Sequence, residues 1–437
     1  MQTKKLFLFD YVILLIVVIL SVIGILFIYS SSFTIFKKAT HHLYIKQIYF
    51  FISGFFILWV ATFINYQKLT EHKIIIYAAT ILVLVLTLFF GKRVNNSTRW
   101  ISIGFITIQP SEFAKIAVII VLAGYLHQIR DHMDNIRYLL PIIGIIGLPV
   151  LLILLEPDLG TAFVFIPITI AMLFMAGIPL KFLLGIFLLL IVGSSIPLFL
   201  TYSQMANMPD NRLVEILSNQ NYILYTALFF IVCAVFLFLI NISMRNIFLN
   251  NLIFFLFIIA LGLIAALFIQ SFLKEYQKER LLVFINPELK RWSSGYNIIQ
   301  SMIAIGSGGF IGKGFLQGTQ SQLGFLPEQS TDFIFSLIGE EVGFIGTIFI
   351  ALLYLMLLYR INKVVLNVKD YLGGYIATGI FAMFLIHIFV NIGMVIGIAP
   401  ITGLPLPFIT AGGSSQWMFM LAIGLIFNIE IRRYVYN

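Results

Sequence analysis

A carboxylate stands at the boundary between a polar segment and an apolar helix in the stretch from Tyr296 to Gly346. Asp332 follows a long glycine-rich approach and precedes an apolar run that contains Glu340 and Glu341. Ionisable side chains at membrane depth are costly and usually serve a function. These three carboxylates therefore mark the first place to expect a site.

Asp332 has two interpretations. It can cap the N-terminus of the helix that follows, as Asp often does. Alternatively, it can act as a general base on an anionic, lipid-linked substrate, since a carboxylate with cations nearby suits that chemistry. The cations that we expect on the same side of the membrane, where they could hold a phosphate, are Lys115, Arg280 and Lys313.

The glycine-rich run from Gly306 to Gly314 does not fit a nucleotide-binding loop. Five residues, not four, separate Gly306 from Gly312, and Lys313 is followed by glycine in place of Ser or Thr. The run instead predicts a flexible or tightly turned backbone. Its N–H groups, together with Lys313, could meet an anionic group at the outer surface.

A second group of polar residues lies between 91 and 117. Arg99 and Trp100 are expected beside the membrane interface, and Pro110-Ser111-Glu112 predicts a helix start with Ser111 as the N-cap. Glu112 and Lys115 are three residues apart, so they share one helix face and can pair. We interpret the group either as a cap with an internal ion pair or as a polar patch at the mouth of a cavity.

The segment Glu156-Pro157-Asp158 forms a corner between two apolar runs. Proline cannot continue the first helix, and Asp158 is a good N-cap for the second. Glu156 has no capping duty and is the better functional candidate. His387 and Asn391 are four residues apart in a late apolar run, and we interpret them as hydrogen-bonding groups inside the bundle.

Composition excludes a soluble fold. The 437 residues are 61% hydrophobic and 10% charged, whereas soluble domains carry about 25% charged residues. The excess of 27 basic over 18 acidic residues is explained by cytoplasmic loops, so we expect membrane lipids and not nucleic acid as a partner. Cys233, the single cysteine, is expected to be a buried packing residue.

Apolar runs long enough to cross a bilayer predict an all-α transmembrane bundle of about twelve spans. The expected spans are 11–31, 47–65, 74–90, 112–128, 138–155, 159–176, 180–200, 222–243, 247–271, 332–358, 372–397 and 405–430. Lys and Arg in the short connections place one set of turns in the cytoplasm. Residues 91–111, 156–158 and the long loop 274–331 then face outward, together with Asp332.

Several blocks of this sequence resemble the SEDS family, named for shape, elongation, division and sporulation, and the phrasing GTQSQ favours its elongation-type members. The blocks occur in the family's order and cover nearly the whole chain. They are RWISIG (99–104), QPSEFAKIA (109–117), EPDLGT (156–161), GYNIIQSMIAIGSGGFIGKGF (295–315), GTQSQLGFLPEQSTDFIFSLIGEEVGF (318–344), FVNIGMV (389–395) and GLPLPFITAGGSS (403–415).

The resemblance implies a peptidoglycan glycosyltransferase of the bacterial cytoplasmic membrane. Such a protein polymerises lipid II, an undecaprenyl-diphosphate-linked disaccharide, beside a class B penicillin-binding protein, and a divalent cation such as Mg²⁺ can assist. It also implies that Asp332 is catalytic. The matching motif positions imply cavity or substrate residues at Arg99, Trp100, Glu112, Lys115, Glu156 and Asp158.

The chain departs from the family pattern in three places. Residues 202–271 are interpreted as an inserted helical hairpin, residues 289–294 replace an acidic, proline-containing stretch, and Ala411 replaces a common tyrosine. A lipid II flippase remains the alternative function, although it would need polar residues in both membrane halves. A scaffold that only recruits the penicillin-binding protein is a third alternative, but it would not need carboxylates at membrane depth.

Overall fold

The structure is a computed structural model. It describes residues 9–33, 42–94, 97–104, 106–133, 135–206, 212–272, 277, 279–280, 283–284, 286–290, 292, 295–326 and 328–433. The chain divides into two compact units, of which one comprises Met1–Gly177 with Asn297–Asn437 and the other comprises Ile178–Tyr296.

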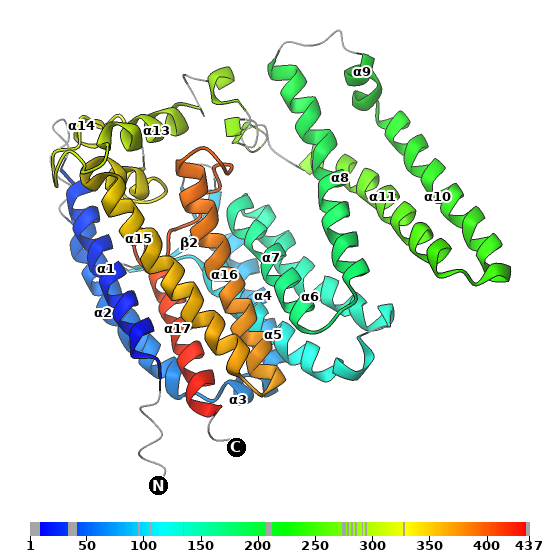
Figure 1. The fold of residues 1–437 in the computed structure, drawn as a ribbon, viewed down its shortest axis with the longest axis horizontal. Helices are drawn as coiled ribbons and strands as arrows, with labels where there is room; N and C mark the ends of the chain where they lie inside the picture. The colour runs from blue at the N-terminus through cyan, green and yellow to red at the C-terminus, as the bar shows by residue number, and fades with distance from the viewer. Residues whose placement is uncertain are drawn as a thin grey trace. The chain divides into compact units, whose positions relative to one another are not determined.

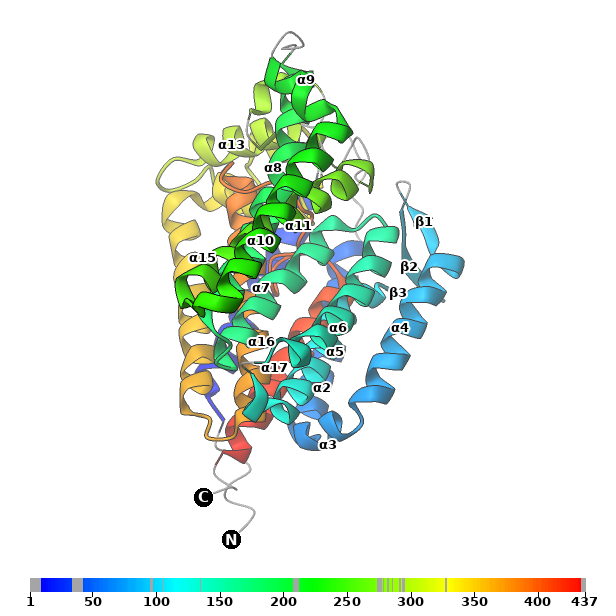
Figure 2. The same ribbon diagram turned by 90° about the vertical axis from the view of Figure 1, so that its right-hand side faces the viewer.

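The first unit is a helix bundle with a small antiparallel sheet of order β1-β2-β3 (Figures 1 and 2). Its helices are α1 (Tyr11–Ser31), α2 (His42–Phe63), α3 (Tyr66–Glu71), α4 (Lys73–Phe90), α5 (Pro110–Gln128), α6 (Ile136–Leu155), α7 (Leu159–Met175), α13 (Tyr296–Gly308), α14 (Thr319–Gln322), α15 (Ile334–Asn367), α16 (Tyr371–Val395) and α17 (Gly413–Arg432), with the 3₁₀ turn η2 (Arg130–His132). Its strands are β1 (Lys92–Val94), β2 (Ser97–Ile103) and β3 (Ile106–Ile108).

The second unit contains α8 (Leu180–Met205), α9 (Arg212–Ser218), α10 (Gln220–Met244), α11 (Ile247–Phe272) and the 3₁₀ turn η3 (Pro287–Lys290). The hairpin of α10 and α11 turns at Arg245, whose φ is 47°. Asn241 closes this turn by accepting from the backbone N–H of Asn246 at 2.7 Å and donating to Asn250 at 2.6 Å. The two helices of this region are confirmed, and their status as an insertion stays a prediction.

Among the described residues, eleven helices are long and apolar enough to cross a membrane, and α7 is a shorter apolar helix. These elements confirm the all-α membrane bundle of about twelve spans. The three-stranded sheet was not predicted. The expected start of the last span at residue 405 is wrong, because α17 begins at Gly413.

Several of the segments expected in the cytoplasm contact one another in the first unit. Asp10, which caps α1, pairs with Arg360 of α15 at 3.1 Å, and its backbone N–H donates to Glu430 of α17 at 2.9 Å. The hydroxyl of Tyr66 in α3 donates to Asp370, the cap of α16, at 2.9 Å. These contacts place the start of α1 beside the ends of α15 and α17, and the α2–α3 connection beside the α15–α16 connection, while the cytoplasmic location of these segments remains a prediction from charge.

The helix α15 is broken at Gly343. A straight helix of its 34 residues would be about 51 Å long at 1.5 Å per residue, well beyond the roughly 30 Å hydrocarbon core. Gly343 has φ 64° and ψ −163°, which interrupts the helix and separates a first part, residues 334–342, from the remainder. Only glycine adopts this backbone conformation without strain.

The polar approach to Asp332 is more structured than the loop that was expected. Tyr296–Gly308 forms α13, so the first glycines of the run belong to a helix end, and Thr319–Gln322 forms α14. Positive φ values at Gly309, Gly312 and Gly314 make tight turns after this helix, which confirms the tightly turned alternative for the remainder of the run.

A non-helical segment, residues 396–412, connects α16 to α17 within the bundle. Pro405 and Pro407 lack N–H groups and disfavour helix, and Gly403 has φ 72°. Irregular backbone at membrane depth requires protein partners for its polar groups. Tyr354 supplies one by donating to the carbonyl of Pro407 at 2.6 Å.

Candidate functional site

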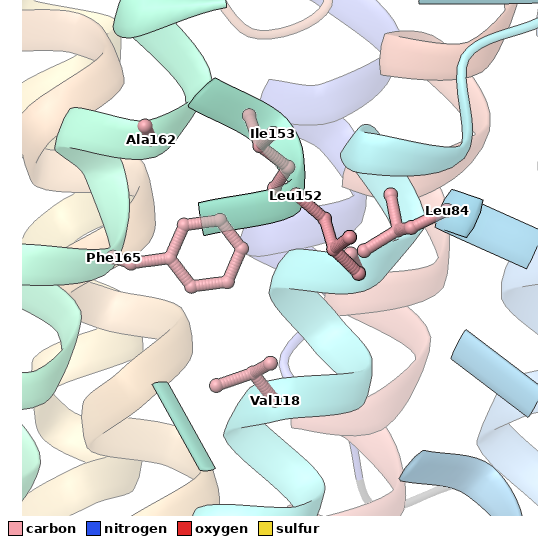
Figure 3. Packing of buried hydrophobic residues seen from close by; sticks show 7 residues of the cluster. Leu84, Val118, Leu152, Ile153, Ala162 and Phe165 are labelled. Atoms are coloured by element: carbon pink, nitrogen blue, oxygen red, sulfur yellow. The ribbon is translucent and has the colours of Figure 1, made fainter. Parts of the chain in front are cut away.

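A buried hydrophobic cluster supports the corner between α6 and α7. It includes Leu152 and Ile153 of α6, Phe165 of α7, and residues of α4 and α5 that pack against them (Figure 3). Because both arms of the corner are fixed by this packing, residues 156–158 are presented at a defined place beside β2 and the start of α5.

Asp158 is the centre of a hydrogen-bond network at this corner. It caps α7 by accepting from the backbone N–H of Thr161 at 3.1 Å and from its hydroxyl at 2.9 Å, which confirms the predicted cap. Gln109, directly before α5, donates to the same carboxylate at 2.9 Å. Arg99 of β2 lies 3.6 Å from it and donates to the carbonyl of Pro157 at 2.7 Å. Asp158 therefore connects the start of α7 with β2 and with the residue that precedes α5.

Glu156 is fully buried beside Asp158, and neither of its carboxyl oxygens has a hydrogen-bond partner among the described residues. Burial, and secondly the Asp158 carboxylate, raise the pKa of Glu156 to about 8, while Arg99 partly offsets the rise. Its position at the C-terminal end of α6, where the helix dipole disfavours an anion, acts in the same direction. Glu156 is therefore a neutral acid at pH 7.

The start of α5 differs from the prediction by two residues. The N-cap is Gln109 and Pro110 occupies the first turn, so Ser111 lies inside the helix. Proline is favoured there because it has no N–H to leave unpaired. The backbone N–H of Gln109 donates to Ser414 at the start of α17 at 2.8 Å, which joins α5 to the end of the non-helical segment.

The predicted pair of Glu112 and Lys115 is confirmed, with 3.0 Å between carboxylate and ammonium. Both side chains are buried. The ammonium also lies 3.0 Å from Nε2 of His387, whose Nδ1 lies 3.1 Å from the carbonyl oxygen of Pro405. Since a carbonyl only accepts, Nδ1 carries the proton and Nε2 accepts from Lys115. The ion pair is thereby connected to the non-helical segment.

Asp332 lies against the same segment. The side chain of Asn391 donates to the carbonyl of Leu404 at 2.7 Å and to that of Asp332 at 3.3 Å, so His387 and Asn391 both form the internal hydrogen bonds that were expected. A Cβ on Gly403 would lie 3.4 Å from Oδ2 of Asp332. The N-cap of α15 is Phe333, without a side-chain cap, so the capping interpretation of Asp332 is wrong.

The other predicted substrate residues are Lys313, Trp100 and Arg280. Lys313 is bound to Glu340 of α15, with 2.8 Å between ammonium and carboxylate. Trp100 neighbours Arg99 on β2, so its side chain points to the opposite face of the strand. Arg280 is an exposed residue of the second unit. Contact with substrate stays a prediction for all three, as it does for Arg99, Glu112, Lys115, Glu156 and Asp158.

Two further residues of the site, Gln109 and Ser414, were not predicted from the sequence. Gln109 and Ser414 join Asp158 to α17, and both lie at helix starts within the conspicuous blocks around residues 109–117 and 403–415. From sequence alone, a polar residue at a helix start is interpreted as a cap, so the hydrogen bonds of these two residues between helices could not be predicted.

The described residues contain no cluster of three or more His, Cys, Asp or Glu side chains that could hold a metal ion. A divalent cation that takes part would be bound by one or two carboxylates of the site together with phosphate oxygens of a substrate, as is common for Mg²⁺.

Comparisons with known proteins show the family of this chain. The family model FTSW_RODA_SPOVE, described as cell cycle protein, matches residues 10–222 and 212–435. The chain is 39% identical to a peptidoglycan glycosyltransferase RodA of Treponema pallidum, with 97% of this chain and 98% of that protein covered. It is 31% identical to the peptidoglycan glycosyltransferase MrdB of Escherichia coli, with 82% and 77% covered.

Two solved structures have a similar fold. One is a chain from a study of polymerization and crosslinking by a peptidoglycan synthase complex, with a TM-score of 0.67, 23% identity, and 98% of this chain and 99% of that chain covered. The other is the rod shape determining protein RodA of Thermus thermophilus, with a TM-score of 0.60, 21% identity and 98% of each chain covered.

Proposed function

Because the chain belongs to the FtsW/RodA/SpoVE family, we propose that it is a peptidoglycan glycosyltransferase of cell elongation, embedded as a multi-pass protein in the bacterial cytoplasmic membrane. Its substrate is lipid II, and its active site faces the outside of the membrane. The relatives that support this assignment include proteins named RodA and MrdB, both described as peptidoglycan glycosyltransferases.

One observation of this structure carries the proposal. The non-helical segment 396–412 lies between a buried polar network and a carboxylate at a helix junction. The network reaches it through the contact of His387 with Pro405, and Asp332 reaches it through Asn391. A bundle that served only to span the membrane would gain nothing from burying these ionisable groups.

In the proposed reaction, Asp332 accepts the proton of the sugar 4-hydroxyl on the acceptor. The hydroxyl oxygen forms a bond to the anomeric carbon of the donor, and the bond from that carbon to the diphosphate breaks. The electron pair leaves with undecaprenyl diphosphate. Cationic side chains such as Arg99 and Lys115 stabilise the charge that develops on the leaving group.

The flippase alternative receives less support. A flippase would need polar residues along both halves of the membrane, and the carboxylates deeper in α15 were the exception to the outward clustering of the polar residues. Glu340 is instead bound to Lys313, and Glu341 accepts from the hydroxyl of Ser30 in α1. Both carboxylates therefore have contacts within the protein that explain their positions.

We also propose that a class B penicillin-binding protein is the partner that crosslinks the glycan strands. The similarity to a chain from a peptidoglycan synthase complex supports such an assembly.

The proposal is tested by supplying lipid II to the purified protein in complex with its class B penicillin-binding protein. Moenomycin is added to silence classical glycosyltransferases. We expect glycan polymer from the wild type and none from Asp332→Asn, which keeps the shape but loses the base. Polymer from both would place the base elsewhere, and no polymer from an intact wild-type complex would favour transport.

A further inference from the structure

The carboxylate of Glu340 is fully buried and is surrounded by donors from the segment that precedes Asp332. Oε1 accepts from the backbone N–H of Gln320 at 2.8 Å, and Oε2 accepts from the backbone N–H and hydroxyl of Ser321, both at 3.1 Å. With the ammonium of Lys313 at 2.8 Å, the charge of Glu340 is compensated. This set of contacts fastens the start of α14 to α15.

Lys313 has little capacity left for a substrate. Its ammonium donates to Ser307 at 2.7 Å, to Thr319 at 2.7 Å and to Glu340 at 2.8 Å. An ammonium group has three donors, so each proton already has a partner within the protein. Lys313 was expected to bind an anionic group, and the anionic group that it binds in the structure is the carboxylate of Glu340.

The backbone of residues 308–314 also interlocks with α15. The N–H groups of Lys313 and Gly314 donate to the carbonyls of Glu340 and Glu341, both at 3.0 Å. Past the break at Gly343, the N–H of Phe344 donates to Gly309 at 2.9 Å. These bonds use backbone groups that the break in α15 would otherwise leave unpaired.

Glycines make this close contact possible. A Cβ on Gly308 would lie 2.0 Å from the carbonyl oxygen of Gly339, and one on Gly312 would lie 2.2 Å from that of Glu341. A Cβ on Gly343 would lie 2.3 Å from the backbone nitrogen of Gly312. The turns after α13 and the first part of α15 therefore fit together backbone to backbone.

The first part of α15 is consequently held at two places. Asp332, at its start, is tied to the non-helical segment through Asn391. Glu340 lies eight residues further along, about 12 Å at 1.5 Å per residue, and is tied to residues 307–321. A change at Glu340 can thus tilt the helix that carries Asp332.

We infer that Lys313 and Glu340 are positioning residues, which fix the first part of α15 and thereby the place of Asp332, and that Lys313 does not hold the substrate. This inference rests on the proposed role of Asp332 as the base. A displacement of about 1 Å at reacting groups can cost about 10²-fold in rate, so small movements here have measurable consequences.

The kinetic test compares Lys313→Met, Glu340→Gln and the double variant in the polymerase assay. We expect each single variant to lower kcat by roughly 10- to 100-fold with KM changed less than about twofold. The double variant should be no worse than Lys313→Met, because it also removes the uncompensated buried carboxylate. Lys46→Met, which removes an exposed lysine, is the matched control.

The opposite pattern would overturn the inference. If Lys313 binds the substrate, Lys313→Met raises KM with little change in kcat, Glu340→Gln has a small effect, and the two effects multiply. Lys313→Arg keeps the positive charge but changes the shape of the side chain. If Lys313 acts by pairing with Glu340, this variant should retain at least part of kcat. A loss of kcat equal to that of Lys313→Met counts against the inference.

Hydrogen exchange supplies a readout that does not depend on activity. In Glu340→Gln, the amides of residues 312–323 should exchange faster, while those of β2, which has no contact with Glu340 among the bonds described, should not change. Unchanged exchange in residues 312–323 would refute the positioning role of Lys313 and Glu340 even in an active protein. If exchange is faster in this variant but the wild-type protein makes no polymer, the contact of Lys313 and Glu340 with residues 312–323 is supported and the proposed function is rejected.

Discussion

Replacement of Glu156 by glutamine should change how the stability of this protein depends on pH. The folded protein holds Glu156 as a neutral acid with a pKa of about 8, whereas the ordinary value is 4.5. Between these two values the unfolded chain has lost a proton that the folded protein keeps. Stability therefore falls as pH rises through this range, and it changes no further once the folded carboxyl also ionises.

The size of the effect follows from the same values. Each pKa unit corresponds to about 1.4 kcal/mol, so the whole range is worth at most about 5 kcal/mol and the interval from pH 6 to 8, at whose upper end the folded carboxyl is half ionised, about 2 kcal/mol. A glutamine side chain at this position imitates the neutral acid and cannot ionise. Glu156→Gln should therefore equal the wild type near pH 4.5 and exceed its free energy of unfolding increasingly toward pH 8.

The assay is thermal unfolding in detergent at pH 5, 6, 7 and 8, with the wild type and Glu156→Gln compared at each pH. Glu71→Gln, which changes an exposed carboxylate, controls for the loss of one charge and should follow the wild type. Equal pH dependence of Glu156→Gln and the wild type would refute the reasoning, because it would mean that Glu156 is already ionised in the folded protein.

Two other changes have defined outcomes. Lys115→Met should reduce the free energy of unfolding by about 3–5 kcal/mol, because it leaves Glu112 buried without its cation, and adding Glu112→Gln should recover part of the loss in a denaturation assay. Gly160→Ala should cost about 1–3 kcal/mol, since a Cβ there would lie 2.1 Å from the carbonyl oxygen of Thr402. Gly147→Ala, in a helix with no atom within 4 Å of the new Cβ, should instead be neutral or stabilising by up to about 1 kcal/mol. Equal losses for the two alanine variants would contradict the close approach.

The sequence by itself determined the class of fold and most of the spans. Long apolar runs leave a chain no alternative to membrane helices, because each backbone group must be paired within the segment. Local rules also identified the Asp158 cap and the pair of Glu112 and Lys115, since both depend on residues three apart along one helix. The family blocks then pointed to Asp332.

Only the tertiary structure decided which polar groups meet. The contacts from Lys115 to His387, from Asn391 to Asp332 and from Lys313 to Glu340 join residues that are far apart in the chain, so no local pattern encodes them.

The non-helical segment 396–412 was mistaken in part for a span for the same reason. Its composition is apolar enough for a helix, and its prolines signal only that regular helix is disfavoured there. Its irregular backbone is stable because side chains such as Tyr354 and Asn391 pair its carbonyls. Those partners exist only once the surrounding helices have packed, which is why the sequence could predict the helices but not the path between them.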